Sequence, residues 1–300
     1  MQKTPYIWMN GKMIPWDDAK IHVLTHALHY GSAVFEGIRF YETPNGPAIF
    51  RLEDHTKRLF YSATTLEMAV PFTEKEVNEA TKKVVAQSGE KSGYIRPIIY
   101  YGYGKMGLYP VGAPVDVAVA CWSWGKYLVD RPVHAKISKY IRIHPRSLIS
   151  DAKVTGHYVN SILASLEAHG EEYDEAILLD FEGKVAEGPG ENVFVVKNGA
   201  LFTPPLGKIL RGITRDSIFR IAKDLGISVT EKEMMPEELF TADELFFTGT
   251  AAEVSPIGTL DKKKIGNGEE GPVTKKIREK FMEAVRGKDE KYKEWLTFLE

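Results

Sequence analysis

The sequence predicts a two-domain α/β protein, with a small α+β amino-terminal domain and a larger α/β carboxy-terminal domain. Its 300 residues suffice for about two domains of roughly 150 residues each. The pattern of the first half is α+β, with a hairpin, two helices and two further strands, whereas helical and strand patterns alternate in the second half. Periodicity is lost between Trp124 and Pro132. We therefore predict a small domain over 1–124, a connection over 125–132 and a larger domain over 133–300.

Turn and capping residues define the elements of the first half. Asn10-Gly11 favours a type I′ hairpin between strands near Tyr6 and Ile14. Helical spacing runs from Arg51 to Met68. A capping box of Thr73 and Glu76 predicts the start of a second helix, and Gly89 predicts its end. Two segments rich in aromatic and β-branched residues, 94–101 and 115–122, predict buried strands.

The second half alternates between the two periodicities. Strands are expected over 135–143 and 176–179, and helices near 158–169 and 214–225. Asn198-Gly199 predicts another hairpin. This order is typical of an α/β domain.

Composition excludes several classes of protein. Lys and Arg number 39 against 41 Asp and Glu, which gives a net charge of -2. The sequence has no long basic stripe that could follow a phosphate backbone, so we expect no nucleic-acid partner. No apolar stretch approaches the roughly 18 residues of a membrane helix, and the amino terminus lacks a signal-peptide core, so we expect a cytoplasmic protein. The single cysteine, Cys121, excludes an internal disulfide, and its apolar neighbours predict a buried small hydrophobe.

The segment Gly102–Gly107 matches the dinucleotide-binding pattern GxGxxG and follows a predicted strand. A dinucleotide turn must begin a helix, and Pro110 and Pro114 prevent one here. We therefore interpret the segment as a flexible flap over a pocket.

His22, His26 and His29 have spacings that a helix would place on one face, which could suggest zinc. No nearby carboxylate or cysteine completes a ligand set. Ordinary hydrogen-bonded histidines are the favoured interpretation, and we expect no metal.

Lys153 lies among small and apolar residues at 151–156, where desolvation would leave more of its amine neutral and nucleophilic. An ordinary surface lysine is the alternative. The second half adds a carboxylate on the glycine-rich turn 187–192 and two turns with exposed amides at 212–216 and 249–253. One lysine, one carboxylate and two anion-binding turns match the requirements of pyridoxal phosphate.

Motifs spread over nearly the whole chain resemble those of the class IV aminotransferases, the fold-type IV pyridoxal-phosphate family, and within it the branched-chain amino acid aminotransferases. The motifs occur in family order: HALHYGSAVFEGIR from His26, HxxRL at His55, YIRP from Tyr94, GHYxNS after Lys153, EGPGEN from Glu187, RGITRD from Arg211 and GTAAE from Gly249. The resemblance implies a transferase that moves the amino group of leucine, isoleucine or valine to 2-oxoglutarate.

The resemblance also implies the cofactor contacts. Lys153 would carry pyridoxal 5′-phosphate and act as acid and base, Glu187 would face the pyridine nitrogen, and Arg58 would hold the phosphate. The implied cofactor-binding residues are Lys153, Arg58, Tyr158, Glu187, Leu210, Gly212, Ile213, Thr214, Gly249 and Thr250.

An aromatic pocket would receive the substrate side chain, with Arg96 and Arg39 available for the distal carboxylate of glutamate. The implied substrate-binding residues are Tyr30, Phe35, Gly37, Arg39, Tyr94, Arg96, Met106, Trp124, Tyr127, Gly190, Thr250 and Ala251. In such enzymes the flap at Met106 to Leu108 reaches a neighbouring subunit, so a homodimer or a homohexamer is expected.

Two residues depart from the family pattern: His157 stands where relatives commonly have asparagine, and Pro189 replaces a small residue. Two other functions stay open. A related class IV enzyme, such as a D-amino acid or amine transaminase or aminodeoxychorismate lyase, would share Lys153 and Glu187 but not the pocket. A non-catalytic binding protein would use Lys153 only as a surface residue.

Overall fold

The computed structural model describes residues 2–125 and 127–299. The chain forms two compact units, and neither is continuous in sequence. Unit 1 comprises Met1–Gly125, Ala152–Gly156 and Ala284–Glu300, and unit 2 comprises Lys126–Asp151 and His157–Glu283. Lys126, within the predicted connection 125–132, lies outside the described residues. The domain bounds 1–124 and 133–300 stay a prediction, and Lys153 belongs to a short segment of unit 1.

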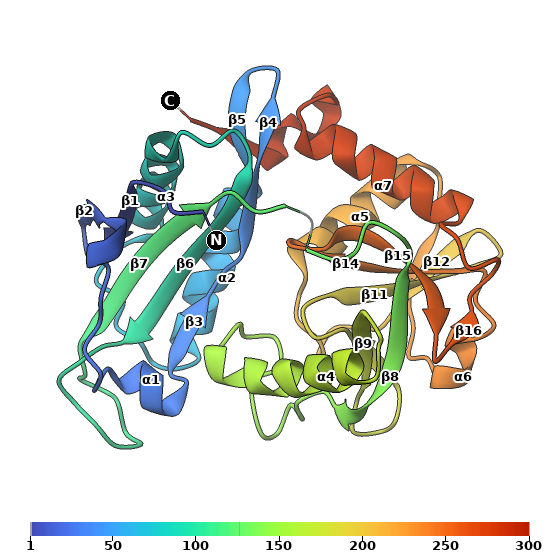
Figure 1. The fold of residues 1–300 in the computed structure, drawn as a ribbon, viewed down its shortest axis with the longest axis horizontal. Coiled ribbons are helices and arrows are strands. Elements are labelled where there is room, and N and C mark those ends of the chain that lie inside the picture. The colour runs from blue at the N-terminus through green and yellow to red at the C-terminus, as the bar shows by residue number, and fades with distance from the viewer. Residues whose placement is uncertain (1, 126, 300) are drawn as a thin grey trace. The chain divides into compact units, whose positions relative to one another are not determined.

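Unit 1 is built on one antiparallel sheet with the order β17-β5-β4-β6-β7-β1-β2, and β3 pairs with β6 (Figure 1). Its strands are β1 (Tyr6–Met9), β2 (Lys12–Pro15), β3 (Ala33–Phe35), β4 (Ile38–Thr43), β5 (Gly46–Phe50), β6 (Gly93–Tyr101), β7 (Val115–Trp122) and β17 (Leu296–Phe298). Its helical elements are η1 (Trp16–Asp18), α1 (His26–Tyr30), α2 (Leu52–Thr64), α3 (Glu74–Ser88) and η3 (Glu290–Trp295).

Local signals in unit 1 are confirmed. Asn10 and Gly11 have φ of 47° and 87°, as a type I′ turn requires, and Ile7 faces Ile14 across the hairpin. Both hydrogen bonds of the capping box at the start of α3 are present: the Thr73 side chain accepts from Glu76 N, and the Glu76 side chain accepts from Thr73 N. The C-cap, Gly89, has φ of 73°. Tyr101 pairs with Val115, so residues 102–114 are the loop of a β6–β7 hairpin and not a dinucleotide turn that begins a helix.

The alternation of β6 and β7 divides the sheet of unit 1 into two faces. Ile95, Ile99, Val117, Val119 and Cys121 belong to the core that α2 and α3 complete, and each is 0% exposed. The prediction that Cys121 is a buried small hydrophobe is therefore confirmed. Residues at the intervening positions point to the opposite face, which carries the predicted substrate residues of β6.

Unit 2 has a mixed sheet with the order β10-β9-β8-β15-β14-β11-β12-β13, and β16 pairs with β15. The pairs β8–β9, β8–β15 and β12–β13 are parallel. Its strands are β8 (Val133–Ile141), β9 (Glu175–Leu179), β10 (Val185–Glu187), β11 (Asn192–Lys197), β12 (Ala200–Thr203), β13 (Val229–Glu231), β14 (Glu244–Gly249), β15 (Glu253–Leu260) and β16 (Lys263–Lys264).

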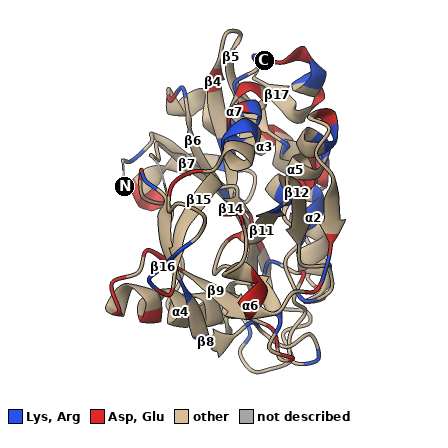
Figure 2. Ribbon diagram, turned by 90° about the vertical axis from the view of Figure 1, so that its right-hand side faces the viewer, with Lys and Arg blue, Asp and Glu red and all other residues tan. Residues whose placement is uncertain are grey.

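The α-helices that begin among the described residues of unit 2 are α4 (Tyr158–Gly170), α5 (Ile213–Asp224), α6 (Pro236–Leu239) and α7 (Pro272–Val285), with η2 (Thr155–His157) just before α4. The predicted strands, helices and hairpin of this half are confirmed within a few residues at their ends. Phe246 and Phe247 on β14 are 0% exposed and contribute to the interior of the unit. Figure 2 shows acidic and basic residues interspersed along α7. In the described part of the chain, no helix is both long and apolar enough to cross a membrane.

Candidate active site

Lys153 is held by backbone contacts within unit 1. Its N–H donates to Ser62 Oγ at 2.9 Å, and its carbonyl accepts from Phe35 N at 3.1 Å. Val154 forms a bridge with Val34 of β3. The Lys153 ammonium nitrogen lies 5.0 Å from the centroid of the Phe35 ring. The position of the lysine is thus determined by α2 on one side and β3 on the other.

One face of α2 carries three polar side chains, His55, Arg58 and Ser62, at spacings of three and four residues. The Ser62 hydroxyl donates to the carbonyl of Arg58 at 2.8 Å and accepts from Lys153 N. One helix face therefore carries both the predicted phosphate-binding arginine and the group that anchors the predicted catalytic lysine.

Glu36, between β3 and β4, lies against this helix face. Arg58 donates to it through Nε at 2.6 Å and Nη2 at 2.8 Å, and His55 Nδ1 lies 2.7 Å from Glu36 Oε2. Glu36 and His55 are fully buried, and the Arg58 side chain is 12% exposed. Sequence reasoning did not identify Glu36, His55 or Ser62, although the first two lie within motifs that it quoted.

Protonation of this cluster follows from burial and charge. Burial would by itself raise the pKa of Glu36, but Arg58 and His55 outweigh it, so the pKa of that carboxyl lies far below its usual range. Burial lowers the pKa of His55, against the opposite influence of Glu36. The ion pair is therefore formed by Glu36 and Arg58, and neutral His55 donates a hydrogen bond through Nδ1.

A row of side chains crosses the face of the unit 1 sheet that is opposite to the core of α2 and α3. Arg39 faces Tyr94, and Tyr94 faces Trp122, on three neighbouring strands. Arg96 lies two residues along β6 on the same face. Its guanidinium carbon is 4.8 Å from the Phe35 ring centroid and 5.4 Å from that of Tyr94. The structure thus brings the two predicted arginines and their aromatic neighbours together.

Close packing explains a glycine in this row. A Cβ at Gly37 would lie 1.8 Å from the Tyr94 hydroxyl, so any other residue would displace that ring. Trp124 makes an edge contact with Tyr94, with centroids 4.5 Å apart. Tyr30 on α1 and Met106 in the 102–114 loop are 43% and 42% exposed on unit 1.

Glu187, at the end of β10, is 4% exposed and surrounded by donors of unit 2. Arg142 Nε lies 2.5 Å from Oε1, and Asn192 Nδ2 lies 3.0 Å from Oε2. Leu210 N donates at 3.1 Å to Oε2. These donors fix an ionised carboxylate in one orientation. Sequence reasoning missed Arg142, which lies 45 residues from Glu187 and has no local signal.

The predicted turn 187–192 contacts two other predicted segments of unit 2. Asn192 Nδ2 also donates to the carbonyl of Leu210 at 3.1 Å. A Cβ at Gly212 would lie 1.9 Å from Asn192 Oδ1, and one at Gly249 would lie 3.1 Å from the carbonyl of Gly190. The turn 187–192 therefore adjoins both the start of the predicted segment 212–216 and the predicted turn 249–253.

The remaining predicted residues of unit 2 lie at the starts of helices or between elements. Gly212 is the N-cap of α5 and offers no side-chain cap, and Ile213 and Thr214 form its first turn. Thr250 and Ala251 lie in the turn between β14 and β15. Tyr158 begins α4, directly after His157, which is 6% exposed. Tyr127 is 43% exposed.

The three histidines near the amino terminus have ordinary hydrogen bonds. His26 lies 2.6 Å from Ser32 Oγ and 2.8 Å from the carbonyl of Gly107, while His29 Nε2 lies 2.9 Å from the carbonyl of Val23. His22 Nδ1 accepts from Leu24 N. Within residues 2–125 and 127–299, no group of three His, Cys, Asp or Glu side chains is arranged to hold a metal ion.

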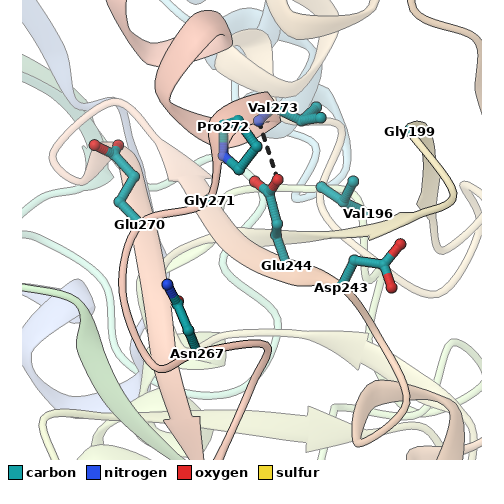
Figure 3. A pocket seen from close by; sticks show the side chains of 9 residues that line it. All are labelled: Val196, Gly199, Asp243, Glu244, Asn267, Glu270, Gly271, Pro272 and Val273. Atoms are coloured by element: carbon teal, nitrogen blue, oxygen red, sulfur yellow. Dashed lines mark hydrogen bonds between the residues drawn. The ribbon is translucent and has the colours of Figure 1, made fainter.

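A cavity of about 440 Å³ lies elsewhere in unit 2, at the start of α7 (Figure 3). Glu244 points toward the helix, and its carboxylate accepts from Val273 N at 3.0 Å and Thr274 N at 2.7 Å. A Cβ at Gly271 would lie 2.0 Å from this carboxylate. Glu244 therefore caps α7. The residues lining this cavity are Val196, Gly199, Asp243, Glu244, Asn267, Glu270, Gly271, Pro272 and Val273, and none is a predicted site residue.

Known proteins resemble the chain over its whole length. Residues 33–260 match the family described as amino-transferase class IV. A branched-chain-amino-acid aminotransferase of Pseudomonas aeruginosa is 46% identical over 297 residues, which cover 98% of this chain and 97% of the relative. The crystal structure of the T.th. branched-chain amino acid aminotransferase complexed with N-(5′-phosphopyridoxyl)-L-glutamate has a TM-score of 0.97 and 48% identity, and the match covers 100% of both chains. The crystal structure of the branched-chain aminotransferase from Thermoproteus uzoniensis with norvaline has a TM-score of 0.95 and 44% identity, over 98% of this chain and 99% of that one. The chain belongs to the class IV aminotransferase family.

Proposed function

We propose that this chain is a pyridoxal-phosphate-dependent transaminase that moves the amino group of L-leucine, L-isoleucine or L-valine to 2-oxoglutarate. Relatives that share more than 40% of its residues over nearly the whole chain are branched-chain aminotransferases. The products are the branched-chain 2-oxo acid and L-glutamate. The two substrates use one pocket in turn, in a ping-pong mechanism.

The single observation that carries the proposal is the row on the sheet of unit 1. Arg96 lies against Phe35 and Tyr94, and the amine of Lys153 lies against Phe35 from a separate segment. An amine beside aromatic surface suits an apolar substrate side chain. An arginine in the same row suits a distal carboxylate.

The residues present fit the cofactor. Glu187 is held as an oriented acceptor by Arg142, Asn192 and Leu210, which suits a protonated pyridine nitrogen. The first turn of α5 has a glycine N-cap and therefore offers amides without a competing side-chain oxygen. Figure 1 shows α5 within unit 2.

When bound, pyridoxal phosphate supplies an electron sink for the charge left at the substrate Cα. Lys153 would hold the cofactor through its amine and would then move the proton at the substrate Cα. Glu187 would keep the ring nitrogen protonated, and Tyr158 would donate to the ring hydroxyl. Leu210 would pack against the ring.

The phosphate would be held by Arg58 together with backbone and hydroxyl donors. Those donors belong to Gly212, Ile213, Thr214, Gly249 and Thr250.

One pocket must accept both an apolar and an acidic side chain. Aromatic and glycine positions provide the apolar surface, and Arg96 with Arg39 pairs with the distal carboxylate of glutamate or 2-oxoglutarate. The amides of Thr250 and Ala251 take the α-carboxylate. The other proposed substrate contacts are Tyr30, Phe35, Gly37, Tyr94, Met106, Trp124, Tyr127 and Gly190.

The test is the visible absorption of the cofactor-loaded protein during separate additions of L-leucine, D-alanine and a chiral amine. We expect L-leucine alone to bleach the band rapidly and 2-oxoglutarate to restore it. Lys153→Ala should abolish the band, whereas Lys91→Ala, which changes a lysine with a 76% exposed side chain, should keep it. Bleaching by D-alanine or the amine instead would favour another class IV activity. A colourless wild type would favour a binding protein.

We also propose that the chain self-associates, as a homodimer or a homohexamer. Support comes from an apolar stripe on α4, where Val159, Ile162, Leu163 and Leu166 are 58%, 55%, 40% and 66% exposed. Leu108, in the predicted flap, is 88% exposed. Light scattering on wild type and Leu166→Glu tests the proposal. If the stripe is buried between subunits, a charge on it should lower the molar mass of the assembly. The expected cytoplasmic location is tested by cell fractionation.

A further inference from the structure

Glu36 forms a buried cluster with His55 and Arg58 of α2, although the mechanism proposed above gives it no role. It accepts hydrogen bonds from Arg58 Nε and Nη2, from His55 Nδ1 and from Gly37 N, the last at 3.3 Å. Burial of a carboxylate is costly unless it is paired and hydrogen-bonded. The cluster therefore holds one guanidinium in one orientation.

The geometry of that ion pair decides how an anion can approach. A guanidinium presents two-nitrogen edges to carboxylates or phosphates. Glu36 occupies the Nε–Nη2 edge of Arg58. The ion pair therefore fixes the plane of the guanidinium, and with it the directions in which Arg58 can donate to a phosphate.

We propose that Glu36, held in turn by His55, is a positioning residue that orients Arg58 for the phosphate of the cofactor. The inference rests on the proposed function, since it requires Arg58 to bind that phosphate. Glu36 touches neither substrate nor cofactor in this account. It acts only through the guanidinium.

The charge of Glu36 by itself predicts the opposite effect. A carboxylate close to a phosphate repels it, so removal of that charge without loss of orientation would strengthen phosphate binding. Loss of orientation would weaken it. In Glu36→Gln one acceptor oxygen replaces two, and the new amide NH2, itself a donor, faces the N–H groups of Arg58 or His55. The substitution therefore removes the orientation of Arg58 together with the charge. The sign of the change in affinity therefore separates positioning from simple charge.

The experiment compares pyridoxal 5′-phosphate with pyridoxal, which lacks the phosphate, by titration of the visible band. Glu36→Gln should weaken binding of the phosphorylated form by roughly tenfold, the loss of about one charge-assisted hydrogen bond. Binding of pyridoxal should stay within about twofold of wild type. The matched control is Asp54→Asn, which removes a carboxylate from α2 that pairs with Arg51. It should change neither affinity.

Coupling to Arg58 gives the decisive comparison. In an Arg58→Ala background, Glu36→Gln should have no further phosphate-specific effect, because the group that it positions is gone. Equal or tighter binding of the phosphorylated cofactor by Glu36→Gln would overturn the inference. If Arg58→Ala itself left the preference for the phosphorylated form unchanged, the proposed phosphate site would be wrong, which is a distinct failure.

A second pair of variants covers the case in which Glu36→Gln does not fold. His55→Asn keeps a donor near the position of Nδ1, whereas His55→Leu removes it. We expect the phosphate-specific loss in His55→Leu and its rescue in His55→Asn. Thermal melting of the apoprotein in inorganic phosphate or in chloride at equal ionic strength gives the same ranking without the lysine chemistry. Equal phosphate protection in both variants and wild type would overturn the inference.

Discussion

Gly212→Ala tests whether the glycine before α5 is required by the side chain of Asn192. The backbone of Gly212, with φ of -65° and ψ of 127°, suits any residue, so alanine adds no backbone strain. Its Cβ, however, would lie 1.9 Å from Asn192 Oδ1. Because real Cβ contacts do not fall below 3.0 Å, the amide must move by more than about 1 Å.

That movement breaks the two hydrogen bonds that Asn192 donates, to Glu187 at 3.0 Å and to Leu210 at 3.1 Å. One of them has a charged acceptor. The expected loss is about 2–4 kcal/mol in the free energy of unfolding. For a chain of this length the melting temperature should fall by roughly 5 °C.

Urea and thermal unfolding of four proteins provide the assay: wild type, Gly212→Ala, Asn192→Ala and the double variant. The double variant should be no less stable than Asn192→Ala alone, since the clash needs both side chains. Gly170→Ala is the control, because a Cβ there would have open space. The reasoning is refuted if Gly212→Ala is as stable as Gly170→Ala, or if the two effects simply add.

Three further predictions concern the site. Ser62→Ala should lower kcat by about tenfold and destabilise the chain by about 1 kcal/mol, because Lys153 N loses its acceptor. Ser88→Ala is the control: its hydroxyl also donates to a helix carbonyl and accepts from a backbone N–H near the end of a helix, and its loss should leave kcat unchanged. Glu187→Gln should lower kcat roughly a hundredfold while the cofactor still binds, and an unchanged single-turnover rate would contradict its role. The pKa of His55 is lowered in the fold, so its contribution to stability is complete above pH 6.5 and falls as the unfolded chain takes up a proton below it, by up to about 1.4 kcal/mol per pH unit. Urea midpoints between pH 7.5 and 5.5 check this, and His55→Asn should flatten the slope.

Local chemistry in the sequence predicted the elements whose ends depend on neighbouring residues. Asn10-Gly11 and Asn198-Gly199 form turns because those residue types tolerate positive φ. The capping box of α3 closes over only three residues. The family was likewise predicted from motifs in a fixed order. Such signals lie within short windows, so they can be recognised without knowledge of the fold.

Two strands of unit 1 that are buried on both faces, β3 and β4, escaped prediction. β3 is buried at every position and β4 at five of its six positions, so neither shows the alternation of a half-exposed strand. Burial on both faces is imposed by neighbours from elsewhere in the chain. Residues 33–43 therefore carry no periodic signal of their own.

Only the tertiary structure identified the groups that hold the proposed catalytic side chains. Glu36 reaches Arg58 across 22 residues, Arg142 reaches Glu187 across 45, and Ser62 reaches Lys153 across 91. The sequence by itself determined which residues could do chemistry, through motifs and residue type. Which side chains orient them depends on how strands pair and where helices pack, because a hydrogen bond needs its two atoms within about 3 Å and separation along the chain does not set that distance.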